Sequence, residues 1–211
     1  MLTSAKGPAF ETPGADGSRV PDVRQDAENC ARCDLYKNAT HLVFGEGPPK
    51  AKVLFVGEQP GDKEDQAGKP FVGPAGKLLD RCLEEAGIER DICYVTNAVK
   101  HFKFTPRGKR RIHAKPNAGE VRACAWWLAA ELRLVHPKLA VALGATALYA
   151  LLGKQAKVTR DRGTVLRSPD GLPVLVTIHP SALLRTLDQP DAELNRARFV
   201  EDLKKIAEFL E

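Results

Sequence analysis

A histidine inside a strongly basic stretch is the first feature of this chain that could do chemistry. His113 ends the run Lys109-Arg110-Arg111-Ile112-His113. The segment 100–115 contains no Asp or Glu and seven cations, which are Lys100, Lys103, Arg107, Lys109, Arg110, Arg111 and Lys115. Because neighbouring positive charge disfavours the imidazolium, we expect His113 to be neutral and nucleophilic at physiological pH. The cations would hold a polyanion such as a nucleic-acid backbone close to it, although an ordinary solvated face is the alternative interpretation.

Further polar residues follow short apolar runs. The run 53–56 is followed by Gly57-Glu58-Gln59-Pro60-Gly61, the run 92–96 by Asn97, and the run 174–178 by His179. Because the carboxyl ends of parallel strands meet at one edge of a sheet, these side chains are expected to converge there. Taken singly, each has a simpler explanation, namely a tight turn with a solvated carboxylate, a capping amide and a backbone-satisfied histidine.

The elements that would position these residues alternate between strand and helix patterns. Apolar strands are expected at 53–56, 92–96, 139–143 and 174–178. Helices are expected at 77–86, from the capping box at 117–120 to about 135, in a short segment after Gly144 that ends at Leu152, and at 191–210. The pattern predicts an α/β fold, a three-layer sandwich with a central four-stranded parallel sheet and helices on both faces. Phe102 and Phe104 alternate with polar residues, which indicates a strand-like edge in the basic segment.

Composition limits the class of protein. Residues 1–25 are rich in Gly, Pro and charge, which predicts a disordered tail before one domain at 26–211. The net charge of +5 slightly favours an anionic partner. The absence of a long apolar run and of a signal-peptide pattern predicts a cytoplasmic protein with no membrane partner. Without an apolar heptad pattern we expect a monomer.

The chain has five cysteines, an odd number that argues against a disulfide framework. Cys30-Ala-Arg-Cys33 is a Cys-x-x-Cys pair and indicates metal or redox chemistry. Together with Cys124 it leaves a four-ligand site one ligand short, for either zinc or an iron–sulfur cluster. Cys82 and Cys93 lie on apolar patterns and are expected to be core thiols.

Taken together, these motifs resemble the uracil-DNA glycosylase superfamily over about residues 28–210, and most closely its iron–sulfur family-four branch. The similar segments are 57–65, 68–76, Thr96-Asn97 and 179–185. The run 109–113 resembles the signature of the X-type subgroup (UdgX), whose members bond covalently to the DNA on which they act.

The resemblance implies a role for each matching position. Phe71 would stack on uracil, Asn97 would read its edge, and His179 would stabilise negative charge on the leaving base. Glu58 and Gln59 would activate or position the attacking group, with Gln59 crowding out the hydrolytic water. Gly57 and Asp62 would line the substrate site. The expected contacts to DNA come from Lys100, Arg110, Arg111, Ser181, Leu184 and Arg185.

The resemblance also implies a [4Fe-4S] cluster held by Cys30, Cys33, His101 and Cys124. His101 stands where ordinary family-four proteins have a cysteine. The expected function is excision of uracil from DNA, single-stranded or double-stranded, followed by attack of His113 on the sugar, which would end turnover. The alternatives are an ordinary turnover glycosylase and a non-catalytic iron–sulfur module that binds single-stranded nucleic acid.

Overall fold

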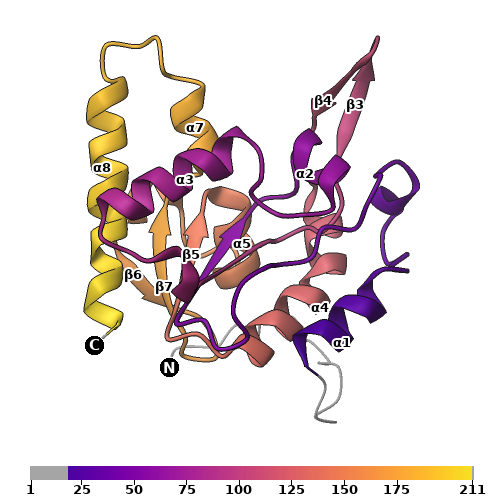
Figure 1. Cartoon of the computed structure of the whole chain (residues 1–211), viewed down its shortest axis with the longest axis horizontal. Coiled ribbons are helices and arrows are strands. Elements are labelled where there is room, and N and C mark those ends of the chain that lie inside the picture. The colour runs from indigo at the N-terminus through magenta and orange to yellow at the C-terminus, as the bar shows by residue number, and fades with distance from the viewer. Residues whose placement is uncertain (1–18, 211) are drawn as a thin grey trace.

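A five-stranded sheet forms the centre of the molecule in the computed structural model, which describes residues 19–210 (Figure 1). The strand order is β2-β1-β5-β7-β6. The strands are β1 (Val53–Gly57), β2 (Cys93–Asn97), β5 (Leu139–Leu143), β6 (Val165–Arg167) and β7 (Pro173–Thr177). The predicted parallel strands β2, β1, β5 and β7 are confirmed, and β6 adds an antiparallel fifth strand at the edge beside β7.

Helices cover both faces of this sheet, which confirms the three-layer sandwich (Figure 1). Because side chains alternate along a strand, Leu54 and Val56 pack in one core cluster, and Val53 and Phe55 pack in the other. The first face is covered by α1 (Val20–Ala27), α4 (Ala118–Val135) and α5 (Ala145–Leu152). The second is covered by α3 (Pro74–Glu85), α7 (Pro180–Leu184) and α8 (Ala192–Lys204). Burial from both sides explains why the parallel strands are continuously apolar.

The longest helix, α4, begins where the sequence predicts. The side chain of Asn117 accepts a hydrogen bond from the backbone N–H of Glu120 at 2.9 Å, and the Glu120 carboxylate accepts one from the N–H of Asn117 at 2.7 Å. This reciprocal pair satisfies donors that have no partner inside the helix. The helix ends before His136, which adopts a left-handed conformation with φ 51°.

The remaining elements are short. They are the 3₁₀ turns η1 (Asp34–Lys37), η2 (Arg90–Ile92) and η3 (Lys205–Phe209), the helices α2 (Asp62–Ala67) and α6 (Val158–Asp161), and the strands β3 (Phe104–Arg107) and β4 (Arg110–His113). β3 and β4 pair only with each other, in an antiparallel hairpin that projects from the body of the molecule (Figure 1). An isolated two-stranded hairpin is marginally stable in water, so side chains from the body must hold it in place.

The predicted N-terminal boundary needs a correction. Residues 1–18 lie outside the described part of the chain, but 20–25 belong to α1 rather than to a disordered tail. Val20, Val23 and Ala27 are buried against the core because they recur at helical spacing. Within residues 19–210, no helix is both long enough and apolar enough to cross a bilayer.

The topology creates a binding edge. From β1 the chain moves to β2 on one side, whereas β5 lies on the other side of β1. Such a switch in strand order leaves a crevice at the carboxyl ends of the two strands. Glu58 follows β1 and Thr146 lies at the start of α5, just after β5, so both residues lie at this crevice.

Candidate active site

The candidate site begins where β1 and β2 end. The register pairs Gly57 with Asn97. A Cβ on Gly57 would collide with Oδ1 of Asn97 and would lie only 2.9 Å from Cζ of Phe71, so glycine is required here. Asn97 is 3% exposed, and its carboxamide has no hydrogen-bond partner among residues 19–210. Among residues 19–210, the only fully buried side-chain polar atom without a partner is Nη2 of Arg162, so the amide of Asn97 keeps some access to solvent and is available to a ligand.

Phe71 is held in an unusual backbone conformation. Its φ is 57°, a left-handed value that bulky residues rarely adopt. Gly76 on α3 packs against this backbone, because a Cβ there would overlap the Phe71 carbonyl and lie 2.8 Å from its Cα. The Phe71 ring stacks on the His179 ring with a centroid distance of 6.2 Å. Strain of this kind is typical of functional sites, and here it accompanies an aromatic ring whose edge lies against Gly57 at the end of β1.

His179 presents a defined hydrogen-bond donor. Its Nδ1 accepts a hydrogen bond from the backbone N–H of Ser181 at 3.1 Å, which assigns the ring proton of the neutral imidazole to Nε2. Burial, helped by the charges of Arg185 and His113 and opposed by that of Glu58, lowers the pKa of His179 to about 4. The ring is therefore neutral at physiological pH, with its Nε2–H free to donate.

A carboxylate joins the two sides of the crevice. Glu58 accepts a hydrogen bond from the hydroxyl of Thr146, and its Oε1 lies 3.3 Å from Nε2 of His113. Burial raises the pKa of Glu58, but the hydrogen bonds from His113 and Thr146 and the charges of His113 and Lys115 outweigh burial and leave the pKa below its usual value. The charged group next to the His113 imidazole is therefore a carboxylate. The expectation that His113 is neutral considered only the neighbouring cations.

Gln59 differs from its predicted role. Its amide donates from Nε2 to the carbonyls of Lys103 and Ala114, each at 3.1 Å, and its Oε1 accepts from the N–H of Lys103 at 3.0 Å. These atoms lie at the base of the β3–β4 hairpin, where the N–H of Ala114 also donates to the carbonyl of Lys103. The side chain is 7% exposed. Gln59 therefore fastens the hairpin that carries His113, and all of its polar atoms are already in use.

Arg111 also needs correction. Arg111 donates to Asp62 at 2.6 Å and to the buried Asp65 at 2.5 Å, so it joins the hairpin to α2 instead of facing DNA. Its guanidinium also lies over the rings of Phe102 and Phe104. Asp62 accepts hydrogen bonds from Arg111 and from Gln66, and its place in the substrate site stays a prediction. A paired arginine stacked on aromatic rings is a rigid attachment.

Lys100 is a third correction. The sequence places it among the cations of the basic segment, but its side chain is 0% exposed and pairs with Glu131 at 2.5 Å. A fully buried ammonium is unable to reach a phosphate on the surface. The surrounding Ala98 and Val99 are also fully buried, so the chain at this point still belongs to the core.

The other predicted DNA contacts are on the surface. Arg110 and Arg185 are exposed, and Ser181 and Leu184 are partly exposed. Ser181 contacts Nδ1 of His179 through its hydroxyl, so it also supports the histidine. Leu187, which the sequence did not single out, is 62% exposed just beyond α7.

The sequence matches the model of the uracil DNA glycosylase superfamily over residues 44–204. The chain belongs to the uracil-DNA glycosylase superfamily. A type-4 uracil-DNA glycosylase of Thermotoga maritima is 39% identical over 189 residues, which cover 89% of this chain and 93% of the relative. The type-4 enzyme of Sulfurisphaera tokodaii is 35% identical over 88% of this chain and 82% of its own length, and that of Archaeoglobus fulgidus 34% over 90% and 92%.

In this superfamily member, the three predicted cysteine ligands lie where the chain after α1 meets α4. Two of the three sulfurs accept an N–H hydrogen bond: Cys30 from Trp127 at 3.1 Å and Cys124 from the backbone of Lys100 at 3.1 Å. N–H donors to cysteine sulfur are typical of iron–sulfur ligation.

Electrostatics also relates these thiols. Burial, opposed by Lys100 and helped by the charges of Cys33 and Cys30, raises the pKa of Cys124 to about 12, so the three sulfurs interact. Burial lowers the pKa of His101, although the charge of Asp65 opposes this shift. The lowered pKa favours the neutral imidazole, which is the form that binds metals. Within residues 19–210 no three His, Cys, Asp or Glu side chains have metal-site geometry. The chemistry of the donor set nevertheless fits a cluster.

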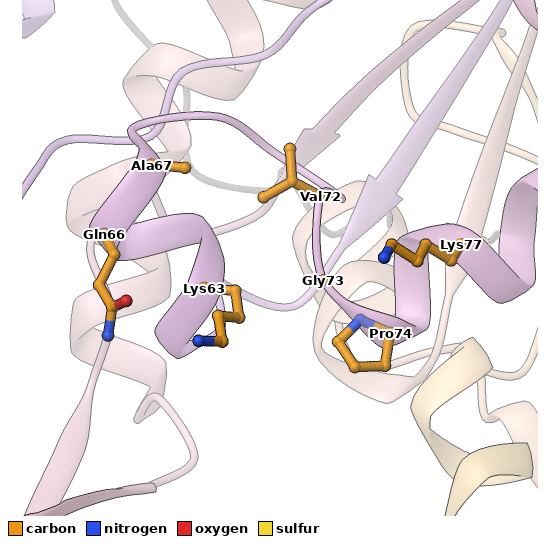
Figure 2. Close-up of a pocket in the computed structure, with 7 residues that line it drawn as sticks. All are labelled: Lys63, Gln66, Ala67, Val72, Gly73, Pro74 and Lys77. Atoms are coloured by element: carbon orange, nitrogen blue, oxygen red, sulfur yellow. The ribbon is translucent and has the colours of Figure 1, made fainter.

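A separate hollow of about 560 Å³ opens between α2 and α3 (Figure 2). Its lining comprises Lys63, Gln66, Ala67, Val72, Gly73, Pro74 and Lys77, so it includes none of the predicted site residues. Lys63 and Lys77 come from the two helices on either side of it (Figure 2). The loop that leads from the Phe71 ring into α3 forms one wall. The hollow is a surface feature beside the pocket, and the convergent polar groups lie elsewhere.

Sequence reasoning missed Thr146 and Glu131. Thr146 lies three residues after β5, at the same edge as Glu58, and the run Gly144-Ala-Thr146 was a usable signal. Glu131 is a single carboxylate on the apolar face of α4, and such a residue requires a buried partner. The convergence of Glu58, Asn97, His179 and the basic segment, which the strand order predicts, is confirmed.

Proposed function

We propose that this protein excises uracil from DNA and then stays bonded to the deoxyribose through His113, as a single-turnover member of the X-type (UdgX) subgroup. The observation that carries the proposal is the 3.3 Å contact between the imidazole of His113 and Glu58, at the crevice that also holds Asn97 and His179. A ring nitrogen paired with a carboxylate is the usual arrangement of an activated nucleophile. The type-4 relatives support the uracil-excision half of this proposal.

Recognition of the base comes first. A base within a duplex is out of reach, so the nucleotide must be flipped out, or the DNA must be single-stranded. In the pocket, the Phe71 ring offers a stacking surface and the unpartnered carboxamide of Asn97 offers one donor and one acceptor. Uracil presents an N–H beside a carbonyl oxygen, and cytosine presents the opposite pattern on that edge. An amide that binds the base in one orientation therefore accepts uracil and rejects cytosine.

Breaking the N-glycosidic bond leaves its electron pair on uracil and positive charge on the sugar. The Nε2–H of neutral His179 is the donor available to the base oxygen on which negative charge grows. A preorganised donor in a buried site stabilises such charge without reorganising, which is worth roughly 3 kcal/mol of the barrier. Because the pKa of His179 is about 4, the ring donates a hydrogen bond without surrendering a proton at neutral pH.

The bond to the protein then forms on the emptied sugar. The unprotonated ring nitrogen of His113 attacks C1′, and its lone pair becomes the new C–N bond. The imidazole gains a positive charge, and Glu58 neutralises it by accepting the proton of the other ring nitrogen. An alkylated imidazole is a poor leaving group, so the enzyme is not regenerated.

The donor set of Cys30, Cys33, His101 and Cys124 is proposed to hold a [4Fe-4S] cluster. When bound, such a cluster would supply a rigid crosslink between the chain after α1 and α4, and no step of the reaction depends on it here. Exposed cations in the basic segment, Arg110 among them, would follow the phosphates of the DNA.

The test is a denaturing gel. The protein is mixed with a single-stranded oligonucleotide that contains one uracil, and with matched oligonucleotides that contain cytosine or thymine there. The proposal expects a shifted band that survives heat and detergent with the uracil oligonucleotide alone, at no more than one DNA per protein. Free enzyme that releases many uracils per molecule would instead establish an ordinary turnover glycosylase. Affinity that ignores uracil and falls steeply with salt would establish a binding module.

A further inference from the structure

A fully buried ion pair lies directly behind the pocket residue Asn97. Lys100 and Glu131 are each 0% exposed, and their charged atoms are 2.5 Å apart. Burying two charges costs about as much desolvation as the attraction returns, so a buried pair is weak evidence for a role in stability. The position of this pair therefore calls for another explanation.

The ammonium of Lys100 uses all three of its N–H donors. They go to Glu131 at 2.5 Å, to the hydroxyl of Thr96 at 2.6 Å, and to the backbone carbonyl of Asn97 at 2.8 Å. A lysine has no further donor, so its head group is fixed in space. Glu131 is equally committed, because it also accepts from Tyr94 at 3.1 Å and from the backbone N–H of Gly45 at 2.8 Å.

Asn97 depends on its backbone for its position. Its carboxamide has no partner among residues 19–210, so no hydrogen bond from the described part of the protein orients the side chain before a base arrives. Asn97 is also the last residue of β2, where regular pairing with β1 ends. The peptide from which the carboxamide extends is held by the ammonium at its carbonyl and, one residue later, by the hydrogen bond from Ala98 to Gly57 at 2.9 Å.

Lys100 joins this turn to α4 at two points. Its side chain pairs with Glu131, and its backbone N–H donates to the sulfur of Cys124 at 3.1 Å. Cys124 and Glu131 are two turns apart on α4 and lie on the same face of that helix. The turn after β2 is therefore fastened to a rigid helix through one residue.

We propose that Lys100 is a positioning residue that sets the selectivity for the base, because it fixes the peptide of Asn97 and hence the carboxamide in the pocket. Glu131 serves as its buried counter-charge. This inference rests on the proposed function, since it assumes that Asn97 reads the base.

The experiment measures selectivity. Removing Lys100 alone would leave Glu131 buried without a counter-charge, so we use Lys100→Met with Glu131→Gln, a neutral pair of similar volume. Oligonucleotides with one 2′-fluoro-2′-deoxyuridine or one 2′-fluoro-2′-deoxycytidine are the ligands, because the fluorine disfavours charge on the sugar and keeps the glycosidic bond intact. The preference is the ratio of the two dissociation constants. Displacement of a positioned group by about 1 Å costs on the order of 10²-fold, so we expect the preference to fall by at least about tenfold.

The control is Tyr94→Phe, which removes one hydrogen bond to Glu131 and leaves the contact between Lys100 and Asn97. It should keep the full preference. A merely structural role for Lys100 predicts lower thermal stability in the double variant with an unchanged preference in the folded protein, and that result overturns the inference. A wild-type protein that binds both oligonucleotides equally overturns the proposed function, and the inference with it.

A measurement on the wild-type protein covers the case in which the double variant does not fold. Free uracil is added to protein labelled with ¹⁵N, and the resonances of the Asn97 carboxamide and the Lys100 ammonium are followed. The inference expects a slowly exchanging Lys100 signal that shifts together with the Asn97 signals. A shift at Asn97 with no response at Lys100 overturns it.

Discussion

The base pocket and the β3–β4 hairpin are built in opposite ways. Asn97 and its neighbours come from strand ends of the central sheet, and Asn97 is almost completely buried. His113 lies on an exposed two-stranded hairpin whose position depends on side chains from elsewhere, namely Gln59 at its base and Arg111 against α2. In the proposed mechanism, the core therefore recognises the base, whereas the hairpin attached to it forms the bond to the sugar. The two functions should separate under mutation.

The largest expected effect comes from removing His113, which should separate crosslink formation from uracil release completely. His113→Ala should abolish the crosslink, because the nucleophile is lost, and should leave uracil release, because no pocket residue is changed. Denaturing gels and assays of released uracil measure the two outcomes. Ile112→Ala is the matched control, since this neighbour is 43% exposed and should leave both intact. A crosslink that persists in His113→Ala would contradict the assignment of the nucleophile.

The second-largest effect is expected when Gln59 loses its hydrogen bonds to the base of the β3–β4 hairpin. Gln59→Ala removes three hydrogen bonds at the base of the hairpin, and misplacing a reacting group by about 1 Å costs on the order of 10²-fold in rate. We expect a slower crosslink and unchanged uracil release. The release is compared between His113→Ala and the double variant His113→Ala with Gln59→Ala. A drop in release would show that Gln59 serves the pocket after all.

Low pH should slow uracil release because it protonates His179. In the His113→Ala background, uracil release should stay flat as pH falls to about 5 and should fall by about tenfold per unit below about 4, because protonation of Nδ1 breaks its hydrogen bond from Ser181. The unfolded chain protonates this ring near pH 6.5 and the folded chain near 4, so the free energy of unfolding also falls between these values. A sharp loss of release near pH 6.5 would contradict the lowered pKa.

The smallest effect distinguishes two adjacent arginines. Arg110 is exposed, so Arg110→Ala should reduce the salt slope of DNA binding by about one and weaken binding a few-fold. Arg111→Ala should leave the slope unchanged and slow the crosslink, because Arg111 holds the hairpin through Asp62 and Asp65. Titrations between low and moderate salt measure the slope. Equal slopes for the two variants would show that Arg111 also faces DNA.

Much of the framework could be predicted from local patterns. The capping box at Asn117 located the start of α4, and the buried runs located the four parallel strands. Strand order then brought Glu58 and Asn97 to one edge, because parallel strands end on the same side. These features depend on periodicity and on topology rules, which a single sequence displays.

The corrections concern pairs that are distant in the sequence. Lys100 and Glu131 are 31 positions apart, and Arg111 and Asp65 are 46 apart. Local charge density makes all the cations of the basic segment look alike, and only tertiary packing decides which of them are neutralised. Residues 20–25 were misjudged for a related reason, since their composition resembles a tail while α4 offers a surface for their apolar side chains.

The carboxylate of Glu131 has a consequence for how the chain folds. This carboxylate accepts hydrogen bonds from a loop at Gly45, from β2 and from the turn at Lys100. If only some of these donors were in place, the charge would be incompletely paired in an apolar interior. Intermediates in which α4 docks before these segments arrive are therefore disfavoured. Assembly of this half of the molecule should be cooperative, with the helix, the strand and the loop protected from hydrogen exchange as one unit.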